Sequence, residues 1–380
     1  PEHYSWTQDL EDEGYNMTYI GKWHVSPDYD PVDFGYDNYV SLGDYHQFKN
    51  EKYPEVEYEN GWFGEPEPVP LEDSRPHWLS RQCIETIKDY SHDNKPWHVR
   101  LDFPGPHLPC RPAGEFAEMY DPDEVPEWGN FQDEFNNKPY IQKQQLLNWN
   151  IEDMSWEDWA PTVAYYYGFI SQIDDAIGRV MDTLEKLELA EDTIVIYTAD
   201  HGDMCGAHRM MDKHYVMYDD IVQVPLVIRW PGKFEAEEVE EFVSNALDLP
   251  PTLLEMIGKE PKDSFQGRSL VPLLKGEEVD DWREEIISTY NGQQFGLYNQ
   301  RMLRTRKWKY IWNPTDVDEL YNLEEDPYEL NNVIDEDQYQ EMVGDFKEKL
   351  YYRLREDDDG LVQSPWMKDQ LLNNKKLNHR

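Results

Sequence analysis

The sequence predicts an α/β protein in two parts, with strands and helices alternating up to about residue 280 and an antiparallel sheet after it. A run of β-branched and aromatic residues over 193–198 is typical of a buried strand. Residues 163–187 repeat apolar side chains at helical spacing. Several short β-rich segments follow residue 280 in close succession. We therefore expect an α/β domain over residues 1–280 and a small antiparallel α+β subdomain over residues 281–380.

The composition is that of a folded, soluble globular protein. Of the 380 residues, 39% are hydrophobic and 14% are aromatic. No apolar run approaches the ~18 residues that a membrane span needs. The three cysteines, Cys83, Cys110 and Cys205, are too few for a disulfide framework, and we expect them to be packing residues. The chain begins with Pro1 and shows no signal-peptide pattern, so the sequence leaves the localisation and the oligomeric state open.

The charge is strongly negative. There are 35 Lys and Arg residues against 79 Asp and Glu residues, which gives a formal net charge of −44. Such a surface repels DNA, RNA and anionic membranes, so we expect no nucleic-acid partner. Two interpretations remain: a very soluble acidic protein, or a halophilic protein whose self-repulsion is screened at high salt, where the Debye length is ~3 Å at about 1 M. We favour the halophilic interpretation.

The first elements follow from turn residues and spacing. We expect a short helix over residues 4–14, which Gly14 ends, and a strand over residues 15–20. Residues 26–76 are rich in Pro, Gly, Asp and Tyr and predict a long loop over the surface. Apolar residues at helical spacing predict a helix over 78–90, and alternation predicts a strand over 97–103.

The middle of the chain gives the clearest helix. Residues 110–160 predict another irregular stretch, and residues 163–187 predict a helix. Strands are expected over 193–198 and 224–230, and a helix over 248–257. The apolar stripe of the long helix consists of Ile170, Ile173, Ile177, Val180, Met181, Leu184 and Leu187.

The pattern changes after residue 280. The short segments 285–290, 302–305, 309–312 and 319–321 predict strands joined by turns. A helix over residues 338–355 closes this part.

Candidate metal ligands stand at the end of the strand over 193–198. Asp200 and His201 follow this strand, and open α/β sheets place their chemistry at the carboxyl ends of strands. A carboxylate beside an imidazole suits a divalent ion such as Ca²⁺, Mg²⁺ or Mn²⁺. The alternative is an acid that caps a turn and a histidine bonded to the backbone, and this pair alone does not decide between them.

Cations and imidazoles recur in three other places. Lys22 and His24 follow the first strand, and they suit an anion-binding amine and a proton donor. His107 lies between two prolines, which stiffen its backbone, and Lys213 follows Asp200 and His201 along the chain. Each of these signals is weak alone, because a surface lysine or a packed histidine would look the same.

Four motifs in this order resemble the type I sulfatase family of the alkaline-phosphatase superfamily. They are Gly14 to Thr18 leading into Gly21-Lys22-Trp23-His24; Thr198 to Gly206 with Lys213; Val224 to Gly232 with Asp248 to Leu254; and Glu319 to Pro327 with Glu329 to Asn332. The resemblance covers nearly the whole chain. It implies an alkaline-phosphatase-like mixed sheet sandwiched by helices, with a small C-terminal subdomain.

The resemblance also implies a site. Asp200 and His201 would match ligands of a metal ion, usually Ca²⁺, with Mg²⁺ as the alternative. Lys22, His24, His107 and Lys213 would match residues that bind the sulfate group and protonate the leaving alcohol. Fixed positive charge and a proton donor are what sulfate-ester hydrolysis requires.

One departure from the family pattern concerns the nucleophile. In the family, a formylglycine made from Cys or Ser in a Cys/Ser-x-Pro/Ala-x-Arg motif precedes the Gly-Lys-Trp-His motif, as does a pair of metal-binding aspartates. The chain from Cys110 to Gly114 has Gly where that motif needs Arg, and it lies in the wrong place in the order. We therefore expect an N-terminally incomplete sequence that lacks the nucleophile, part of the metal site and one or more central strands. We expect the chain as given to be inactive.

The expected activity is sulfatase activity on a sulfated carbohydrate or a small aryl or alkyl ester. A phosphonate or phosphate monoester hydrolase of the same superfamily needs the same cations and metal, so these motifs do not separate the two. The remaining alternative is a non-catalytic sulfatase-like binding protein.

Overall fold

The first part of the chain alternates strands and helices. The computed structural model of the protein describes residues 4–292 and 297–375. The strands are β1 (Asn16–Gly21), β2 (Asn38–Ser41), β3 (Trp97–Asp102), β4 (Val195–Thr198) and β5 (Leu226–Arg229). The helices are α1 (Thr7–Asp12), α2 (Leu42–Lys52), α3 (Arg75–Tyr90), α4 (Tyr140–Trp149), α5 (Trp156–Lys186), α6 (Asp219–Val222), α7 (Asn245–Met256) and α8 (Val271–Leu274).

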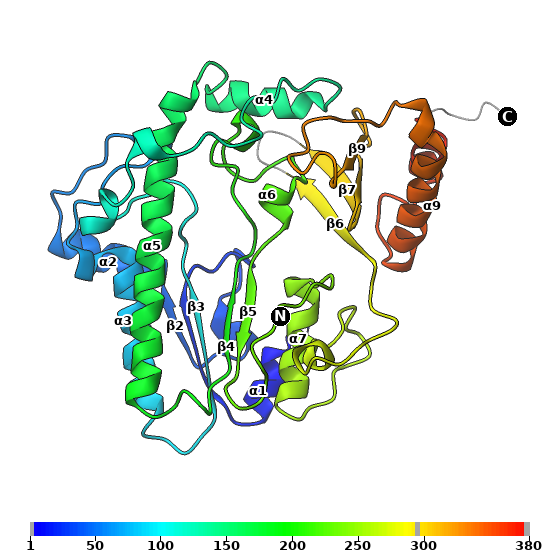
Figure 1. Ribbon diagram of the computed structural model, residues 1–380. Helices are drawn as coiled ribbons and strands as arrows, with labels where there is room; N and C mark the ends of the chain where they lie inside the picture. The colour runs from blue at the N-terminus through cyan, green and yellow to red at the C-terminus, as the bar shows by residue number, and fades with distance from the viewer. Residues whose placement is uncertain (1–3, 293–296, 376–380) are drawn as a thin grey trace.

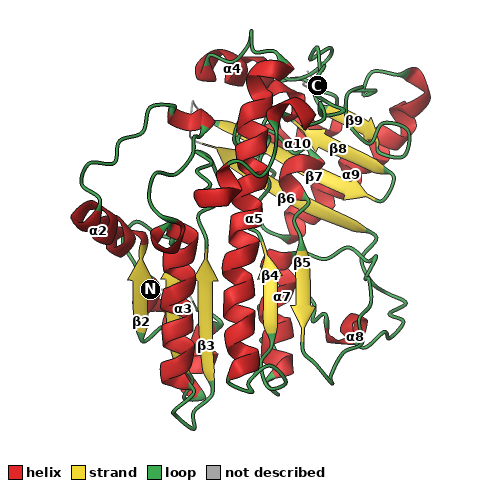
Figure 2. Cartoon of the chain, turned by 60° about the vertical axis from the view of Figure 1, so that its left-hand side comes forward, coloured by secondary structure: helices red, strands yellow, loops and turns green. Residues whose placement is uncertain are grey.

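These strands form one layer between two layers of helices (Figures 1 and 2). Strands β2, β1 and β3 pair in that order as a parallel sheet, and β4 pairs with β5 in the antiparallel sense. Helices α3 and α5 lie on one side of the layer, and α1 and α7 lie on the other. The predicted mixed α/β architecture is therefore confirmed.

Strands β3 and β4 are neighbours in this layer without being hydrogen-bonded. In Figure 2, β3 and β4 point in the same direction and β5 points the opposite way. Within residues 4–292 and 297–375, no strand pairs with the second edge of β3 or of β4. The cross-strand pair Tyr197 and Val227 is 46% and 57% exposed, which is unusual for the middle of a sheet. The expected missing central strand stays a prediction, and these free edges are where it would pair.

The predicted loop over residues 26–76 is wrong in part, because it contains β2 and α2. Tyr45 is the one residue of α2 that is buried, so no apolar stripe marks this helix. Its start is instead stabilised by a capping box between Ser41 and Asp44. Helix α4 was likewise missed within residues 110–160.

Helix α5 begins earlier than predicted, at Trp156, where Ser155 and Asp158 form a capping box. Ile170, which the helical spacing places on the apolar stripe, is exposed. The polar Gln172 is buried instead, because its amide oxygen accepts from Ala113 and its amide nitrogen donates to Ser74. The buried face of α5 is therefore held partly by the hydrogen bonds of Gln172 and not only by the apolar side chains that the spacing predicts.

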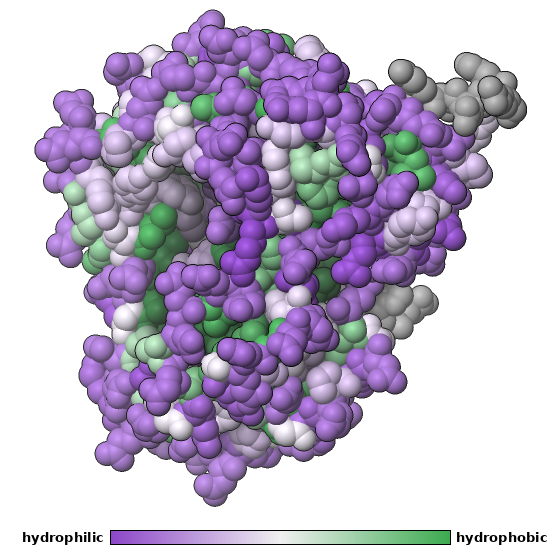
Figure 3. All heavy atoms as spheres, turned by 45° about the vertical axis from the view of Figure 1, so that its right-hand side comes forward, coloured by the Kyte–Doolittle hydropathy of each residue, from purple (hydrophilic) through white to green (hydrophobic). Residues whose placement is uncertain are grey.

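The outer surface is hydrophilic over most of the face in Figure 3, although a hollow in that face exposes apolar residues on its floor. Within the described part of the chain, no helix has both the length and the apolar character needed to cross a membrane.

The C-terminal part is an antiparallel sheet covered by helices, as predicted. Strands β6 (Glu285–Gly292), β7 (Tyr298–Thr305), β8 (Trp308–Trp312) and β9 (Glu319–Asn322) pair in chain order. Helix α9 (Gln340–Glu356) packs on this sheet, and α10 (Pro365–Leu372), which was not predicted, packs on α9. The division into domains near residue 280 stays a prediction.

A buried ion cluster joins the C-terminal sheet to the first part of the chain. The ammonium of Lys309, on β8, lies 2.7 Å from a carboxylate oxygen of Asp219 and 2.6 Å from one of Glu329. Arg304, on β7, donates to both carboxylate oxygens of Asp219. Lys309 is fully buried and Glu329 nearly so. Buried charges persist only when they are paired, so this cluster fixes the C-terminal sheet against the start of α6.

We expect Lys309→Met to lower the free energy of unfolding by about 3–5 kcal/mol, because it leaves buried carboxylates without their cation. Lys307→Met is the matched control: Lys307 pairs with Glu324 at 2.7 Å, but both side chains are exposed. The control substitution should lower the free energy of unfolding by at most about 1 kcal/mol. Urea unfolding followed by tryptophan fluorescence measures the free energy of unfolding of both variants. Equal losses in Lys309→Met and Lys307→Met would contradict a stabilising role for the buried cluster.

Candidate active site

The carboxyl ends of three strands bring the predicted site residues to one edge of the layer. Lys22 follows β1, His107 lies in the loop after β3, and Asp200 and His201 follow β4. Because β1 and β3 are parallel and β4 points the same way as β3, these residues leave the sheet on the same side (Figure 2). Lys213 reaches the same place from the segment between β4 and α6.

Two glycines permit close backbone approaches at this edge. Gly21 has a φ of +112°, and a Cβ there would lie 1.9 Å from the carbonyl oxygen of Asp102. A Cβ on Gly202 would lie 1.8 Å from the carbonyl oxygen of Asp220. Any other residue at either position would therefore displace the neighbouring backbone, and with it Lys22 or His201.

The central contact of the site joins Lys213 to His107. The Lys213 ammonium lies 2.6 Å from Nε2 of His107, and Nδ1 of His107 lies 2.9 Å from the carbonyl oxygen of Leu108. Since Leu108 can only accept, Nδ1 carries the proton and Nε2 accepts from Lys213. The imidazole is therefore neutral. Burial lowers the pKa of His107, and the charges of Lys213 and Lys22 lower it further.

Asp212 holds this contact from beside it. One carboxylate oxygen accepts from Lys213 at 3.1 Å and lies 3.6 Å from Nε2 of His107, and the other lies 3.4 Å from Nε2 of His214. Burial raises the pKa of Asp212, but Lys213, His214 and His107 outweigh it, so the net pKa is lowered. Nδ1 of His214 in turn contacts the hydroxyl of Tyr290 on β6 at 3.1 Å.

Sequence reasoning missed Asp212 and Tyr290 and did not assign His214 to the site. The available signal was the run Asp212-Lys213-His214, in which a carboxylate and an imidazole flank the predicted lysine. Nothing in the sequence relates Tyr290 to this run, because the contact depends on how the C-terminal sheet packs.

Asp200 and His201 form a pair suited to a cation. Nδ1 of His201 donates to the carbonyl oxygen of Gly202 at 2.6 Å, which leaves the lone pair of Nε2 free. That nitrogen lies 3.5 Å from Oδ2 of Asp200, a separation that two ligands of one ion adopt when each bond is ~2.0–2.6 Å long. Within the described residues, no group of three or more His, Cys, Asp or Glu side chains could hold a metal ion. Asp200 and His201 would thus supply two of the donors that a metal ion needs.

Lys22 and His24 differ in their surroundings. Burial lowers the pKa of Lys22; Asp200 opposes this shift and Lys213 adds to it, so Lys22 lies close to the rest of the site. His24 is exposed and makes no hydrogen bond or ion pair with another described residue. The role predicted for His24 stays a prediction.

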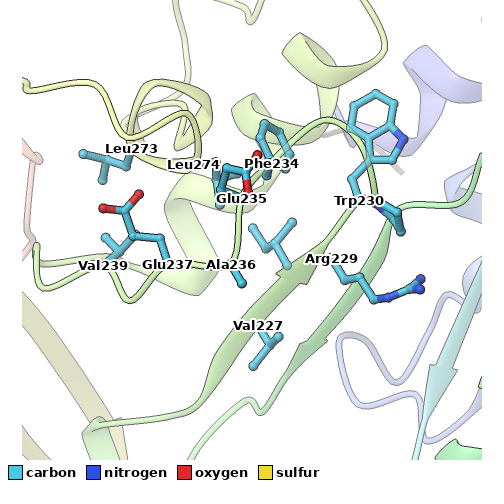
Figure 4. Close-up of a pocket in the computed structure, with 12 residues that line it drawn as sticks. Val227, Arg229, Trp230, Phe234, Glu235, Ala236, Glu237, Val239, Leu273 and Leu274 are labelled. Atoms are coloured by element: carbon cyan, nitrogen blue, oxygen red, sulfur yellow. The ribbon is translucent and has the colours of Figure 1, made fainter. Parts of the chain in front are cut away.

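A separate pocket lies along β5 and does not belong to this site (Figure 4). Its volume is about 470 Å³, and its lining combines apolar side chains such as Val227 and Leu273 with Glu235 and Glu237. None of the predicted site residues lines it.

Comparisons with known proteins give one consistent result. The family model described as Sulfatase matches residues 8–259, and the model described as N-sulphoglucosamine sulphohydrolase, C-terminal, matches residues 206–356. An arylsulfatase from Clostridium perfringens is 29% identical over 300 residues, which are 75% of this chain and 58% of that protein. The uncharacterized sulfatase YidJ from Escherichia coli is 30% identical over 341 residues, 86% of this chain and 66% of that protein. The chain thus spans about six-tenths of the length of these curated relatives.

The fold is also found among solved structures. The phosphonate monoester hydrolase of Agrobacterium radiobacter matches with a TM-score of 0.77 and 24% identity, covering 92% of this chain and 80% of that chain. This similarity confirms the predicted alkaline-phosphatase-like fold.

We expect Lys213→Met to raise the pKa of His107 toward its usual value of about 6.5, because the nearest charge that opposes protonation is removed. NMR titration of the imidazole resonances measures this shift. Lys186→Met, which removes an exposed cation on α5, is the control and should leave the pKa unchanged. A protonated His107 at neutral pH in the unmodified protein would contradict the assigned hydrogen bonds.

Proposed function

The chain belongs to the sulfatase family, and from this premise we propose that the whole protein hydrolyses a sulfate monoester. The observation that carries the proposal is the gathering of Lys22, His107 and Lys213 beside Asp200 and His201 at one edge of the sheet. Two ammonium groups in a half-buried setting neutralise the negative charge of a sulfate group far better than they would in water.

We assign the two lysines to the sulfate oxygens and separate the roles of the two histidines. His107 accepts a hydrogen bond at Nε2, so it positions Lys213 and is not charged. The leaving alcohol needs a proton, and an imidazole able to carry one must supply it. His24 is exposed and follows Lys22 by two residues, which supports it as the donor.

We propose that Asp200 and His201 hold a divalent ion, Ca²⁺ in preference to Mg²⁺. When bound, such an ion would polarise the sulfate group. Further ligands, and the formylglycine nucleophile on which the ester would be cleaved, would come from a segment that precedes this chain. The free edges of β3 and β4 support this proposal, since an additional strand between them would end at the same edge of the layer.

The proposed substrate is a sulfated carbohydrate or a small aryl or alkyl sulfate. A phosphonate or phosphate monoester is the second candidate, which the similarity to a phosphonate monoester hydrolase favours. Hydrolysis of either class of ester needs the same cations and metal. Kinetic measurements on both classes are therefore needed to tell which one is the substrate.

We expect the full-length protein, expressed from its natural coding sequence, to hydrolyse 4-nitrophenyl sulfate with a higher kcat/KM than 4-nitrophenyl phenylphosphonate. Lys213→Ala should lower kcat by about 100-fold or more, because a donor to the developing charge is lost. Lys186→Ala, on the exposed face of α5, is the control. A higher kcat/KM on the phosphonate would favour the second candidate. A folded protein that hydrolyses neither of these esters, nor sulfate esters of carbohydrates, would favour a binding protein.

We expect calcium to raise the melting temperature of the protein and Asp200→Ala to abolish that rise, because a ligand that binds the native state alone stabilises it. Asp192→Ala, an exposed position in the loop before β4, should keep the calcium effect. An unchanged melting temperature after chelation in the unmodified protein would contradict the metal assignment.

We also propose that the protein is adapted to high salt, on the basis of its net charge of −44. Its melting temperature should rise between low salt and about 1 M salt, since screening removes the repulsion among surface carboxylates. A melting temperature that did not rise would remove this proposal.

A further inference from the structure

Two arginines beside the candidate active site have almost no acidic partner. Arg75 is the first residue of α3, and Arg111 follows Cys110 in the loop beyond His107. The Nε atom of each is buried without a hydrogen-bond partner. Among the described residues, Arg75 forms no ion pair, and the nearest carboxylate to Arg111 is that of Glu65 at 3.9 Å.

This isolation is unexpected in so acidic a chain. Carboxylates outnumber Lys and Arg by 79 to 35, so an unpaired guanidinium is not explained by a shortage of partners. Burying the Nε–H of a guanidinium without an acceptor costs free energy. Burial lowers the pKa of Arg75; the carboxylate of Glu67 opposes this shift, and the like charge of Arg111 adds to it. An anion between them would satisfy both.

The ring contacts of the two arginines do not replace these missing acceptors. Arg111 lies over the ring of Tyr58, with Cζ at 3.6 Å from the ring centroid, and Arg75 is 5.9 Å from the ring of Phe169. Such contacts hold the guanidinium planes in place but leave the N–H donors at their edges unused. The arrangement is therefore pre-oriented for a planar or tetrahedral oxyanion.

Carboxylates near the pair do not satisfy it. Lys49 lies 4.6 Å from the ring centroid of Tyr58, and Glu67 accepts from the hydroxyl of Tyr58. Glu65 lies 3.9 Å from Arg111. The buried Nε–H of each arginine is nevertheless left without an acceptor.

The pair lies beside the loop that carries His107. Arg75 is 5.9 Å from the ring of Phe169, and a Cβ on Gly105, two residues before His107, would lie 2.5 Å from that ring. Arg111 is the next residue after Cys110, whose thiol donates to the carbonyl oxygen of Pro106 in the same loop. A substrate whose ester group lies beside His107 could therefore extend toward both arginines.

We propose that Arg75 and Arg111 bind a second anionic group of the substrate, a sulfate or a carboxylate, next to the ester that is hydrolysed. The site would then select esters that carry two negative charges over esters that carry one. This inference rests on the proposed function for its catalytic consequence, but the binding of an anion by the arginine pair does not.

The first experiment compares two substrates in the full-length protein: 4-nitrophenyl sulfate and the same ester with a ring carboxylate. The measured quantity is the ratio of their kcat/KM values, the carboxylated ester over the plain one. Arg75→Gln and Arg111→Gln should each lower this ratio by about 10- to 100-fold, because charge-assisted hydrogen bonds are lost. Arg75→Lys keeps the charge but not the planar guanidinium group, so its ratio should lie between those of the unmodified protein and Arg75→Gln.

Arg81→Gln is the matched control, since Arg81 lies on the same helix, is more exposed, and donates to the carbonyl oxygen of Glu72. It should leave the ratio at the value of the unmodified protein. A ratio that stays constant in Arg75→Gln and Arg111→Gln would overturn the proposal, as would an equal fall in the control.

The second experiment separates this inference from the proposed function. Calorimetric titration of the full-length protein with inorganic sulfate at low ionic strength should find two bound ions, and one in the double variant Arg75→Gln, Arg111→Gln. This result would support the anion site even if the protein hydrolysed no ester. Equal stoichiometry in both proteins would overturn it even if sulfatase activity were found.

Discussion

The contact between Lys213 and His107, at 2.6 Å, is the interaction on which the rest of the site depends. An ammonium can approach an imidazole this closely only when the imidazole is neutral and accepts the proton of the hydrogen bond. Leu108 fixes the tautomer from one side, and Asp212 supplies the negative charge that keeps Lys213 in place from the other. The positive charge of the site is thereby held in a fixed position before any substrate binds, which is the preorganisation that charge stabilisation requires.

The C-terminal sheet contributes to this arrangement although it carries none of the predicted site residues. Lys309 and Arg304 clamp Asp219 at the start of α6, a few residues beyond Lys213. Tyr290, on β6, reaches His214 beside the same lysine. The sheet therefore holds the segment between β4 and α6 both beside Lys213 and at the start of α6. The packing of the C-terminal sheet thus helps to position Lys213 in the candidate active site.

Strand-end chemistry could be predicted from the sequence because it depends on local signals. A β-rich run followed by Asp200 and His201 already indicates both the strand and its carboxyl end. Helix α2 escaped prediction because its stability comes from a capping box and not from an apolar stripe. Asp212 had a local signal, because it stands beside the predicted lysine and bonds to it. Arg75 and Arg111 escaped because their significance depends on a lack of acceptors that only the folded structure shows.

The central claim is that Lys22 and Lys213 bind the sulfate group beside a metal ion held by Asp200 and His201. A crystal structure of the full-length protein grown with Mn²⁺ and inorganic sulfate tests it most directly, because anomalous scattering locates the metal. We predict the metal on the Asp200 carboxylate and on Nε2 of His201, with sulfate oxygens about 3 Å from both ammonium groups. A metal bound away from Asp200 and His201, or a sulfate that touches neither lysine, would contradict the account.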